Sequence, residues 1–146
     1  MTSEEFLIRY QSHVKDLRLP FSPDDLLGWS LSSDVTPSEL SLVDGLFAAM
    51  VAKKDETVIR TLNKLSRIPQ KNPLVFSNFK MDLLNEKAKR QVLSLKSLSF
   101  LSSKRNVIMI GPTGTGKTHL AMAIGNECCN NKMKAYFIKM DELKDK

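Results

Sequence analysis

Apolar residues recur at helical spacing over the first half of the chain, and a polar start signal stands before each run. The first signal is the pair Thr2 and Glu5, which matches a capping box. The apolar positions that follow, three or four residues apart, predict an amphipathic helix to about Leu19; they are Phe6, Tyr10, Val14 and Leu17.

Two further helices are predicted from the same kind of signal. Ser22-Pro23 places a cap and then a proline at the first helical position, so we expect a short helix through Leu26, Leu27 and Trp29. Thr36-Pro37 repeats the signal, and the apolar period then continues to Ile68, either as one helix or as two broken near Asp55. We interpret Trp29 as a core anchor and His13 as a surface or half-buried helix residue that binds no ligand.

The pattern changes after Pro73. Residues 74–80 read as extended, and a helix is predicted from Met81 to about Leu101. Residues 106–110 are a short apolar, β-branched run of the kind found in buried parallel strands, and residues 135–138 read as a second strand. Between them, residues 117–130 are rich in helix formers. The order of strand, turn, helix and strand predicts an α/β fold with a helical region before it.

The turn between the first strand and its helix carries the most specific chemistry. It fits the phosphate-binding pattern G-x-x-x-x-G-K-[ST] and reads Gly111-Pro112-Thr113-Gly114-Thr115-Gly116-Lys117-Thr118. Glycines let backbone N–H groups approach phosphate oxygens, and the helix start adds further N–H groups and a positive dipole end. We expect Lys117 to reach the β- and γ-phosphates as the catalytic cation and Thr118 to ligate Mg²⁺. We count His119 among the nucleotide-binding residues, as a packing or phosphate-proximal residue and not as a general base. The alternative is a flexible Gly/Thr turn with a capping threonine, which accounts for neither the Lys-Thr pair nor the strand before it.

Charge is distributed unevenly around the net value of +6. Residues 1–59 carry −5, residues 60–105 carry +9 from eleven basic and two acidic side chains, and residues 106–146 carry +2. A basic belt of this kind is typical of a DNA contact. The alternative is a solvated helical face rich in lysine.

Length and composition limit the class of protein. A chain of 146 residues with 42% hydrophobic residues suits one modest domain or two small ones. The longest stretch free of charged residues has eleven members, too short to span a bilayer, and the acidic start shows no secretory signal, so we expect a cytoplasmic location without membrane contact. Cys128 and Cys129 are adjacent in a predicted helix, which favours reduced thiols packed as small apolar residues.

A family resemblance extends these expectations. The stretch from Asn106 to Asn131 resembles the IstB family of transposition helper ATPases and its relatives, the DnaC-type helicase loaders. His119-Leu120-Ala121 after the Lys-Thr pair, and Gly125 further on, carry this closer likeness. Upstream, the basic helix and the aromatic segment before the core are also similar to that family, at Arg60, Asn63, Lys64, Arg67-Ile68-Pro69, Phe76 and Phe79.

The resemblance implies an AAA+ type P-loop NTPase core that binds ATP with Mg²⁺, DNA or partner contact through an N-terminal helical region, and assembly into oligomers on DNA. A transposase or a replicative helicase is the implied protein partner. We accordingly divide the chain into a helical region, residues 1–75, and a partial ATPase core, residues 76–146.

The family pattern also requires a strand ending in Asp-Glu, sensor residues and an arginine finger, and this chain offers no clear candidates. Asp141 and Glu142 follow an apolar run, but only 23 residues separate Thr118 from Asp141, so Asp141 is better interpreted as the cap of a following helix. The sequence therefore predicts an ATPase core truncated after its second strand, with a loosely packed C-terminal part.

Three functions remain open at this point. The first is an ATP-binding helper of DNA transposition or helicase loading. The second is a non-hydrolysing module that still binds DNA or a partner. The third is an unrelated P-loop enzyme such as a small-molecule kinase, which would leave the basic belt unexplained.

Overall fold

The computed structural model describes residues 1–144, and its contacts divide the chain into two compact units, Met1–Thr57 and Val58–Lys146. Each unit is described by itself. The predicted functional division between residues 75 and 76 stays a prediction, because compactness does not test which residues contact DNA.

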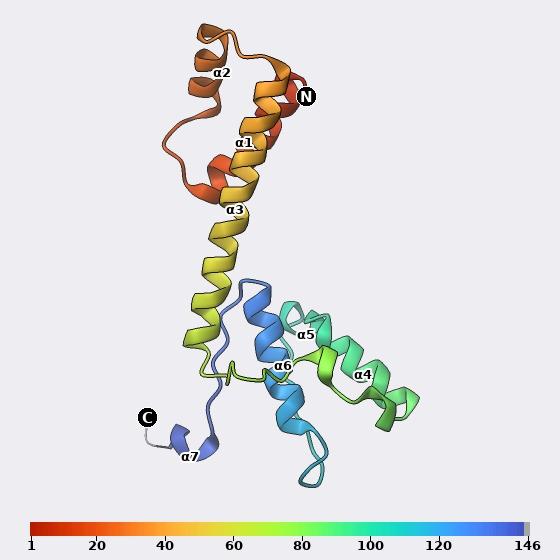
Figure 1. Ribbon diagram of the computed structural model, residues 1–146. Coiled ribbons are helices and arrows are strands. Elements are labelled where there is room, and N and C mark those ends of the chain that lie inside the picture. The colour runs from red at the N-terminus through yellow and green to blue at the C-terminus, as the bar shows by residue number, and fades with distance from the viewer. Residues whose placement is uncertain (145–146) are drawn as a thin grey trace. The chain divides into compact units, whose positions relative to one another are not determined.

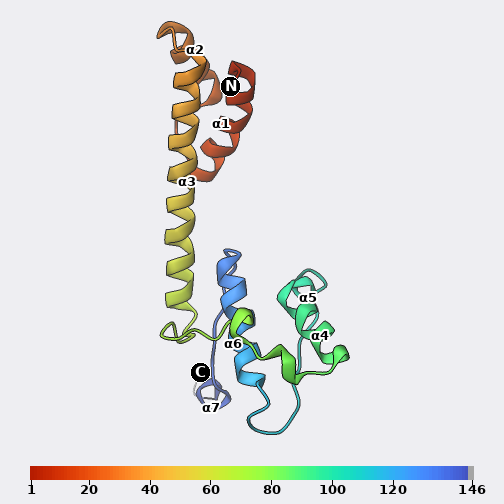
Figure 2. The same ribbon diagram turned by 45° about the vertical axis from the view of Figure 1, so that its right-hand side comes forward.

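The first unit is a helical assembly of α1 (Ser3–Leu17), α2 (Pro23–Ser32) and the first part of α3 (Pro37–Leu65). In Figures 1 and 2, α1 and α2 both lie beside the N-terminal part of α3. Their inward faces meet in one apolar cluster formed by Phe6, Tyr10, Leu26 and Leu40. The Tyr10 hydroxyl donates to the Phe21 carbonyl at 3.0 Å, so the buried ring keeps its polar atom satisfied.

The predicted helix starts of this unit are confirmed. Thr2 and Ser22 each accept a backbone N–H at the third helical position, and the carboxylates of Glu5 and Asp25 accept the cap N–H in return. Glu39 closes the same reciprocal pair with Thr36. The apolar period after Pro37 forms one helix to Leu65, which selects the first of the two alternatives.

A buried carboxylate in the first unit has no counterpart among the sequence predictions. Asp44 on α3 is 7% exposed, and it accepts from Arg9 at 3.0 Å and lies 3.1 Å from His13 Nε2. His13 is half-buried and its ring stacks near that of Phe47. Because Trp29 is 42% exposed, its interpretation as a core anchor is wrong; the rings of Phe6 and Tyr10 fill the core instead.

The second unit continues with two short 3₁₀ turns, η1 (Phe76–Asn78) and η2 (Met81–Leu83), then α4 (Glu86–Lys96), α5 (Ser99–Ser102), α6 (Lys117–Asn130) and α7 (Met140–Leu143). Helix α6 has the predicted bounds and packs against α4 and η1. Both Cys128 and Cys129 are buried on it as free thiols, and burial raises the pKa of each. Reduced thiols packed as small apolar residues were predicted here, and the structure shows both cysteines buried without a disulfide.

Two predictions in this unit are wrong, one of an extended segment and one of a helix. Residues 74–80 are not extended, because the Asn78 side chain accepts from the Val75 N–H at 2.9 Å and folds a turn. The helix predicted from Met81 to Leu101 starts only at Glu86, where Asn85 caps it, and breaks at Leu98. Leu98 has φ 56° and is buried, so packing of this side chain overrides the continuing apolar period.

The α/β prediction is not confirmed, since residues 1–144 form helices and turns and no strand. Residues 106–110 keep an alternating pattern, with Val107 and Met109 half-covered and Ile108 and Ile110 exposed by 82% and 92%. A strand exists only through hydrogen bonds to a neighbouring strand. Within the described residues, the second predicted strand, residues 135–138, forms no strand pair with residues 106–110. The Phe137 N–H donates instead to the Ser66 carbonyl at 2.7 Å.

The last helix also differs from its prediction. Lys139 is the N-cap of α7, and Asp141 lies in the first turn of that helix instead of capping it. A carboxylate in the first turn still complements the helix dipole. In the described part of the chain, no helix is both long and apolar enough to cross a membrane.

Candidate functional site

The loop of residues 111–116 leads directly into α6. Both Figure 1 and Figure 2 show it projecting beyond the start of that helix. Gly114 and Gly116 have φ values of 83° and 94°, in the left-handed region that favours glycine. A side chain at Gly111 would approach the Thr115 hydroxyl to 3.3 Å. The backbone conformation therefore favours glycine at positions 114 and 116, and the space at position 111 is tight.

Among the described helices of more than one turn, the start of α6 differs from the others; the four-residue helices α5 and α7 also lack a side-chain cap. Side-chain oxygens of Thr2, Ser22 and Asn85 cap α1, α2 and α4, whereas α6 begins at Gly116 with no side-chain cap within residues 1–144. The first N–H groups of any helix have no partner inside it. At α6 these groups stay available to an acceptor from outside, and the positive end of the helix dipole favours an anionic one.

Lys117 provides the cation of the site. Its ammonium donates to the carbonyls of Gly111 and Pro112 at 2.6 and 2.5 Å and lies 3.4 Å from the Thr115 hydroxyl. Thr115 in turn donates to the Pro112 carbonyl at 2.9 Å. Lys117 and the loop carbonyls thus stabilise each other. A bound anion could replace these carbonyls as the acceptor, and the hydrogen bonds would be stronger because both partners would then be charged.

The loop residues also surround a small hollow of about 470 Å³. It is lined by Thr113, Gly114, Gly116, Lys117, Thr118 and His119, which are six of the nine predicted cofactor-binding residues. Thr118 is exposed at this hollow, with its hydroxyl in the first turn of α6. The structure therefore brings the predicted magnesium ligand, the predicted cation and the uncapped helix start together.

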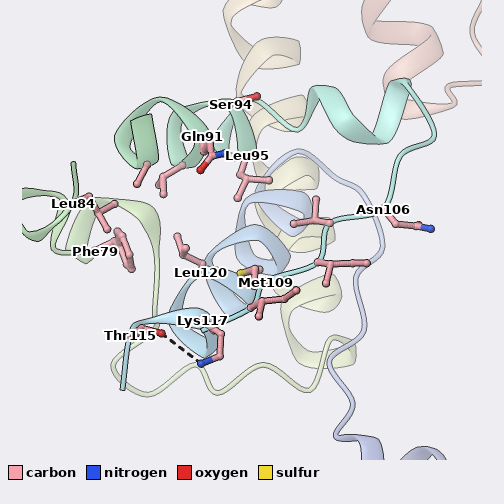
Figure 3. Close-up of a pocket in the computed structure, with 15 residues that line it drawn as sticks. Phe79, Leu84, Gln91, Ser94, Leu95, Asn106, Met109, Thr115, Lys117 and Leu120 are labelled. Carbon is pink, nitrogen blue, oxygen red and sulfur yellow. Dashed lines mark hydrogen bonds between the residues drawn. The ribbon is translucent and has the colours of Figure 1, made fainter. Parts of the chain in front are cut away.

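A second, larger hollow of about 600 Å³ lies on the other side of Lys117. Figure 3 shows Lys117 and Thr115 at one end of it and Asn106 at the other. Its lining is mainly apolar and comes from Phe79 and Leu84 on either side of η2, from α4, from residues 106–110 and from α6; it includes Val92, Leu95, Met109 and Leu120. Apolar walls do not suit phosphate, so the hollow of residues 113–119, which contains the uncapped helix start, is the candidate phosphate site.

His119 does not act as an isolated residue of this site. Its Nε2 lies 2.9 Å from the Val75 carbonyl and 3.0 Å from Asn78 Oδ1, and its ring meets that of Phe79 edge to face at 5.1 Å. Asn78 and Asn126, which also bonds the segment before η1, were missed in the sequence. The signal that could have identified Asn126 is an amide within an otherwise apolar helix face; the structure shows that this side chain is buried.

The acidic residues near the C-terminal end lie elsewhere. Glu142 pairs with Arg67 at 3.5 Å, and Arg67 also stacks over the Tyr136 ring at 5.1 Å. These residues surround a separate hollow that includes Pro69, Met122 and Phe137. Within residues 1–144, no group of three or more His, Cys, Asp and Glu side chains is placed to hold a metal ion.

Comparison with known proteins gives one consistent family. The family described as "IstB-like ATP binding protein" matches residues 28–146. The "Insertion sequence IS5376 putative ATP-binding protein" of Geobacillus stearothermophilus is 36% identical over 98 residues, covering 67% of this chain and 38% of its own length. The corresponding protein of IS232 from Bacillus thuringiensis subsp. berliner is 30% identical over 73% of this chain and 43% of its own length. An IS21-like relative from Bacteroides fragilis is 26% identical over 94% of this chain and 51% of its own.

The chain thus spans about half the length of these relatives or less. The matched residues include the phosphate loop, the whole of α6 and the whole basic belt of residues 60–105. Since the family match covers well over half of the chain, the protein belongs to the family of IstB-like ATP-binding proteins.

Proposed function

We propose that this protein binds ATP with Mg²⁺ through residues 111–119 and serves as an ATP-binding helper of DNA transposition. The observation that carries the proposal is the uncapped start of α6 at Gly116, immediately followed by Lys117 and Thr118. The family match and the names of the insertion-sequence relatives support ATP as the nucleotide and transposition as the process.

The residues present fit the group. Backbone N–H groups of the loop and of the first turn of α6 would hold the phosphates, Lys117 would neutralise their charge, and the exposed Thr118 hydroxyl would ligate the metal. Magnesium, when bound, bridges phosphate oxygens and offsets their negative charge. We propose phosphate-loop roles for the remaining predicted residues, Gly111, Pro112, Thr113, Gly114 and Thr115, and for Gly116.

Calorimetric titration with MgATP tests this function. We expect Lys117→Ala to weaken binding about tenfold to a hundredfold, because a hydrogen bond to a charged group contributes about 1.5–3 kcal/mol. Lys134→Ala, an equal charge change at another exposed position of the same unit, should leave the affinity unchanged. Equal loss in both variants, or no binding by the folded wild type, would remove the proposal.

We also propose that residues 60–105 contact DNA, with a transposase as the protein partner and a cytoplasmic location. Support comes from their charge of +9 and from a shallow hollow on α4 whose lining residues include the cations Lys87 and Arg90. Affinity for duplex DNA should fall with salt at a log–log slope of about −0.9 per neutralised phosphate. The slope should become shallower in Lys87→Glu/Arg90→Glu but not in the matched pair Lys15→Glu/Arg18→Glu.

A non-hydrolysing role is the second candidate. The observation in its favour is that Glu142, an acid from the run that resembles the expected second motif, is held by Arg67. Steady-state ATP hydrolysis with and without DNA separates the two functions. MgATP binding without turnover in either condition favours the interaction module, and DNA-stimulated turnover favours the helper ATPase.

A further inference from the structure

Residues 68–79, which we call the lead segment, run along α6 and are fixed to it at several points. Asn126, 4% exposed on α6, donates to the Leu74 carbonyl at 2.9 Å. Near the other end of the contact, Gly125 lies so close to Ile68 that a Cβ there would be 2.4 Å from Ile68 Cδ1. The lead segment is therefore packed onto the helix that carries Lys117 and Thr118.

The bond at His119 has a defined direction. Asn78 donates from Nδ2 to the Pro73 carbonyl at 2.9 Å, and its Oδ1 accepts from the Val75 N–H at 2.9 Å, so its amide orientation follows from two partners. Both atoms facing His119 Nε2, the Val75 carbonyl and Asn78 Oδ1, are consequently acceptors. His119 must be the donor, with its proton on Nε2.

Phe79 makes a second contact at the same place. A Cβ on Gly116 would lie 2.9 Å from Cε2 of the Phe79 ring, so this ring rests on the last glycine of the phosphate loop. The same Phe79 ring meets the ring of His119 edge to face, in the first turn of α6. A displacement of Gly116 therefore requires Phe79 to move, because the contact leaves no gap between them.

Anion binding is expected to rearrange the hydrogen bonds within the phosphate loop. Lys117 donates to two loop carbonyls, and it must redirect at least part of this bonding to reach a phosphate oxygen. The redirected lysine adjoins Gly116 in the chain, the residue on which Phe79 rests. Gly116 thus links anion binding by the loop to the position of the lead segment.

We propose that His119 is a positioning residue that couples the phosphate loop to the lead segment. By donating to Val75 and Asn78, it holds η1 against the first turn of α6, so that nucleotide in the loop stabilises this arrangement. Lys71 and Lys80, near the two ends of the lead segment, are then positioned according to the state of the loop. The inference rests on the proposed MgATP binding and adds a route from the nucleotide to the basic belt.

Amide hydrogen exchange at Val75, measured on the 146-residue chain with and without MgATP, tests the coupling directly. In the wild type we expect exchange at Val75 to slow about threefold or more on adding MgATP, because the bond to Asn78 opens less often. In His119→Phe, which keeps a ring against Phe79 but has no donor, Val75 exchange should no longer respond at MgATP concentrations that saturate this variant in calorimetric titration.

Two further variants separate coupling from a general loss of structure. His119→Gln restores an N–H donor and should recover the response at Val75. Asn131→Ala, which removes a bond to the Glu127 carbonyl at the far end of α6, should leave the response intact. Protection of Ala123, which is buried on α6, reports whether each variant is folded.

The outcomes are distinguishable. A wild type that binds no MgATP removes the proposed function and this inference with it. A wild type that binds MgATP without any change at Val75 overturns the coupling alone, and so does a His119→Phe variant whose Val75 responds as in the wild type.

Discussion

The two units of this chain differ in the kind of backbone that carries their exposed apolar residues. In Met1–Thr57, Phe6 and Tyr10 are 2% and 1% exposed within one closed cluster. In Val58–Lys146, Ala123 and Cys129 are buried on α6, yet Ile108 and Ile110 are exposed by 82% and 92%. The first unit also exposes Leu31 and Leu42, by 76% and 77%, but on helices α2 and α3, whereas the second exposes Ile108 and Ile110 in a segment that forms neither helix nor strand.

The difference follows from the kind of interaction each unit depends on. Helices close their backbone hydrogen bonds within a few residues, so caps and an apolar face suffice to position them. An extended segment closes its bonds only against a neighbouring strand, and both its faces need cover when it is apolar. The first unit contains only elements of the local kind.

The largest effect that would sharpen this comparison is expected at the core of the first unit. Phe6→Ala should lower the free energy of unfolding by about 3–5 kcal/mol, because a fully buried ring leaves a cavity. Urea unfolding followed by Trp29 fluorescence measures it, since this tryptophan lies in the same unit. A loss below about 1 kcal/mol would mean that the cluster is not the core of the unit.

A smaller loss is expected where α6 meets the lead segment. Gly125→Ala should cost about 1–3 kcal/mol through its clash with Ile68, in spite of the better helix propensity of alanine. Ile68→Val removes Cδ1 and should recover much of that loss in the double variant. Gly45→Ala on α3, where nothing lies within 4 Å, is the matched control and should be neutral or stabilising. Equal effects of Gly125→Ala and Gly45→Ala would show that the close approach is not energetically important.

Acid should weaken the first unit through its helix starts. Hydrogen bonds from Thr2, Ser22 and Thr36 lower the pKa of Glu5, Asp25 and Glu39 below their ordinary values of 4.5, 3.8 and 4.5. A lowered folded-state pKa means that the stabilisation is present above the ordinary value and is lost as pH falls through the folded one. The urea midpoint of the unit should therefore decline below about pH 4.5, and by less in the triple variant Glu5→Gln/Asp25→Asn/Glu39→Gln. An identical decline in both proteins would contradict this origin.

The smallest effect is expected at the uncovered segment. Ile110→Ser should change the free energy of unfolding by less than about 0.5 kcal/mol, because the side chain is already exposed. It should also reduce self-association, since exposed apolar strands favour aggregation. Sedimentation velocity together with urea unfolding checks both; a large loss of stability would show that Ile110 is covered in solution.

Sequence and structure agree where signals are local and diverge where they are not. The capping pairs at Thr2 and Ser22 and the bounds of α6 follow from neighbouring residues and were predicted. The break at Leu98 depends on where its buried side chain packs, and residues 106–110 depend on distant strand partners, so neither could be inferred from the neighbouring sequence.

The candidate site shows the same division. The phosphate loop could be found from its residues because its spacing reflects backbone conformation, and the positive φ values of Gly114 and Gly116 agree with that reading. The partners of His119 could not, because Val75 and Asn78 lie more than forty residues away. Only the folded chain shows that His119 bonds the lead segment.

The central claim is that the loop before α6 holds the phosphates of MgATP. Amide chemical shifts of the ¹⁵N-labelled chain, recorded while MgATP is added, test it most directly. The account predicts that the largest shifts occur at Gly114, Gly116, Lys117 and Thr118, and that Lys117→Ala sharply reduces them. Saturable shifts centred elsewhere, or a folded protein whose loop amides do not respond to MgATP, would contradict it.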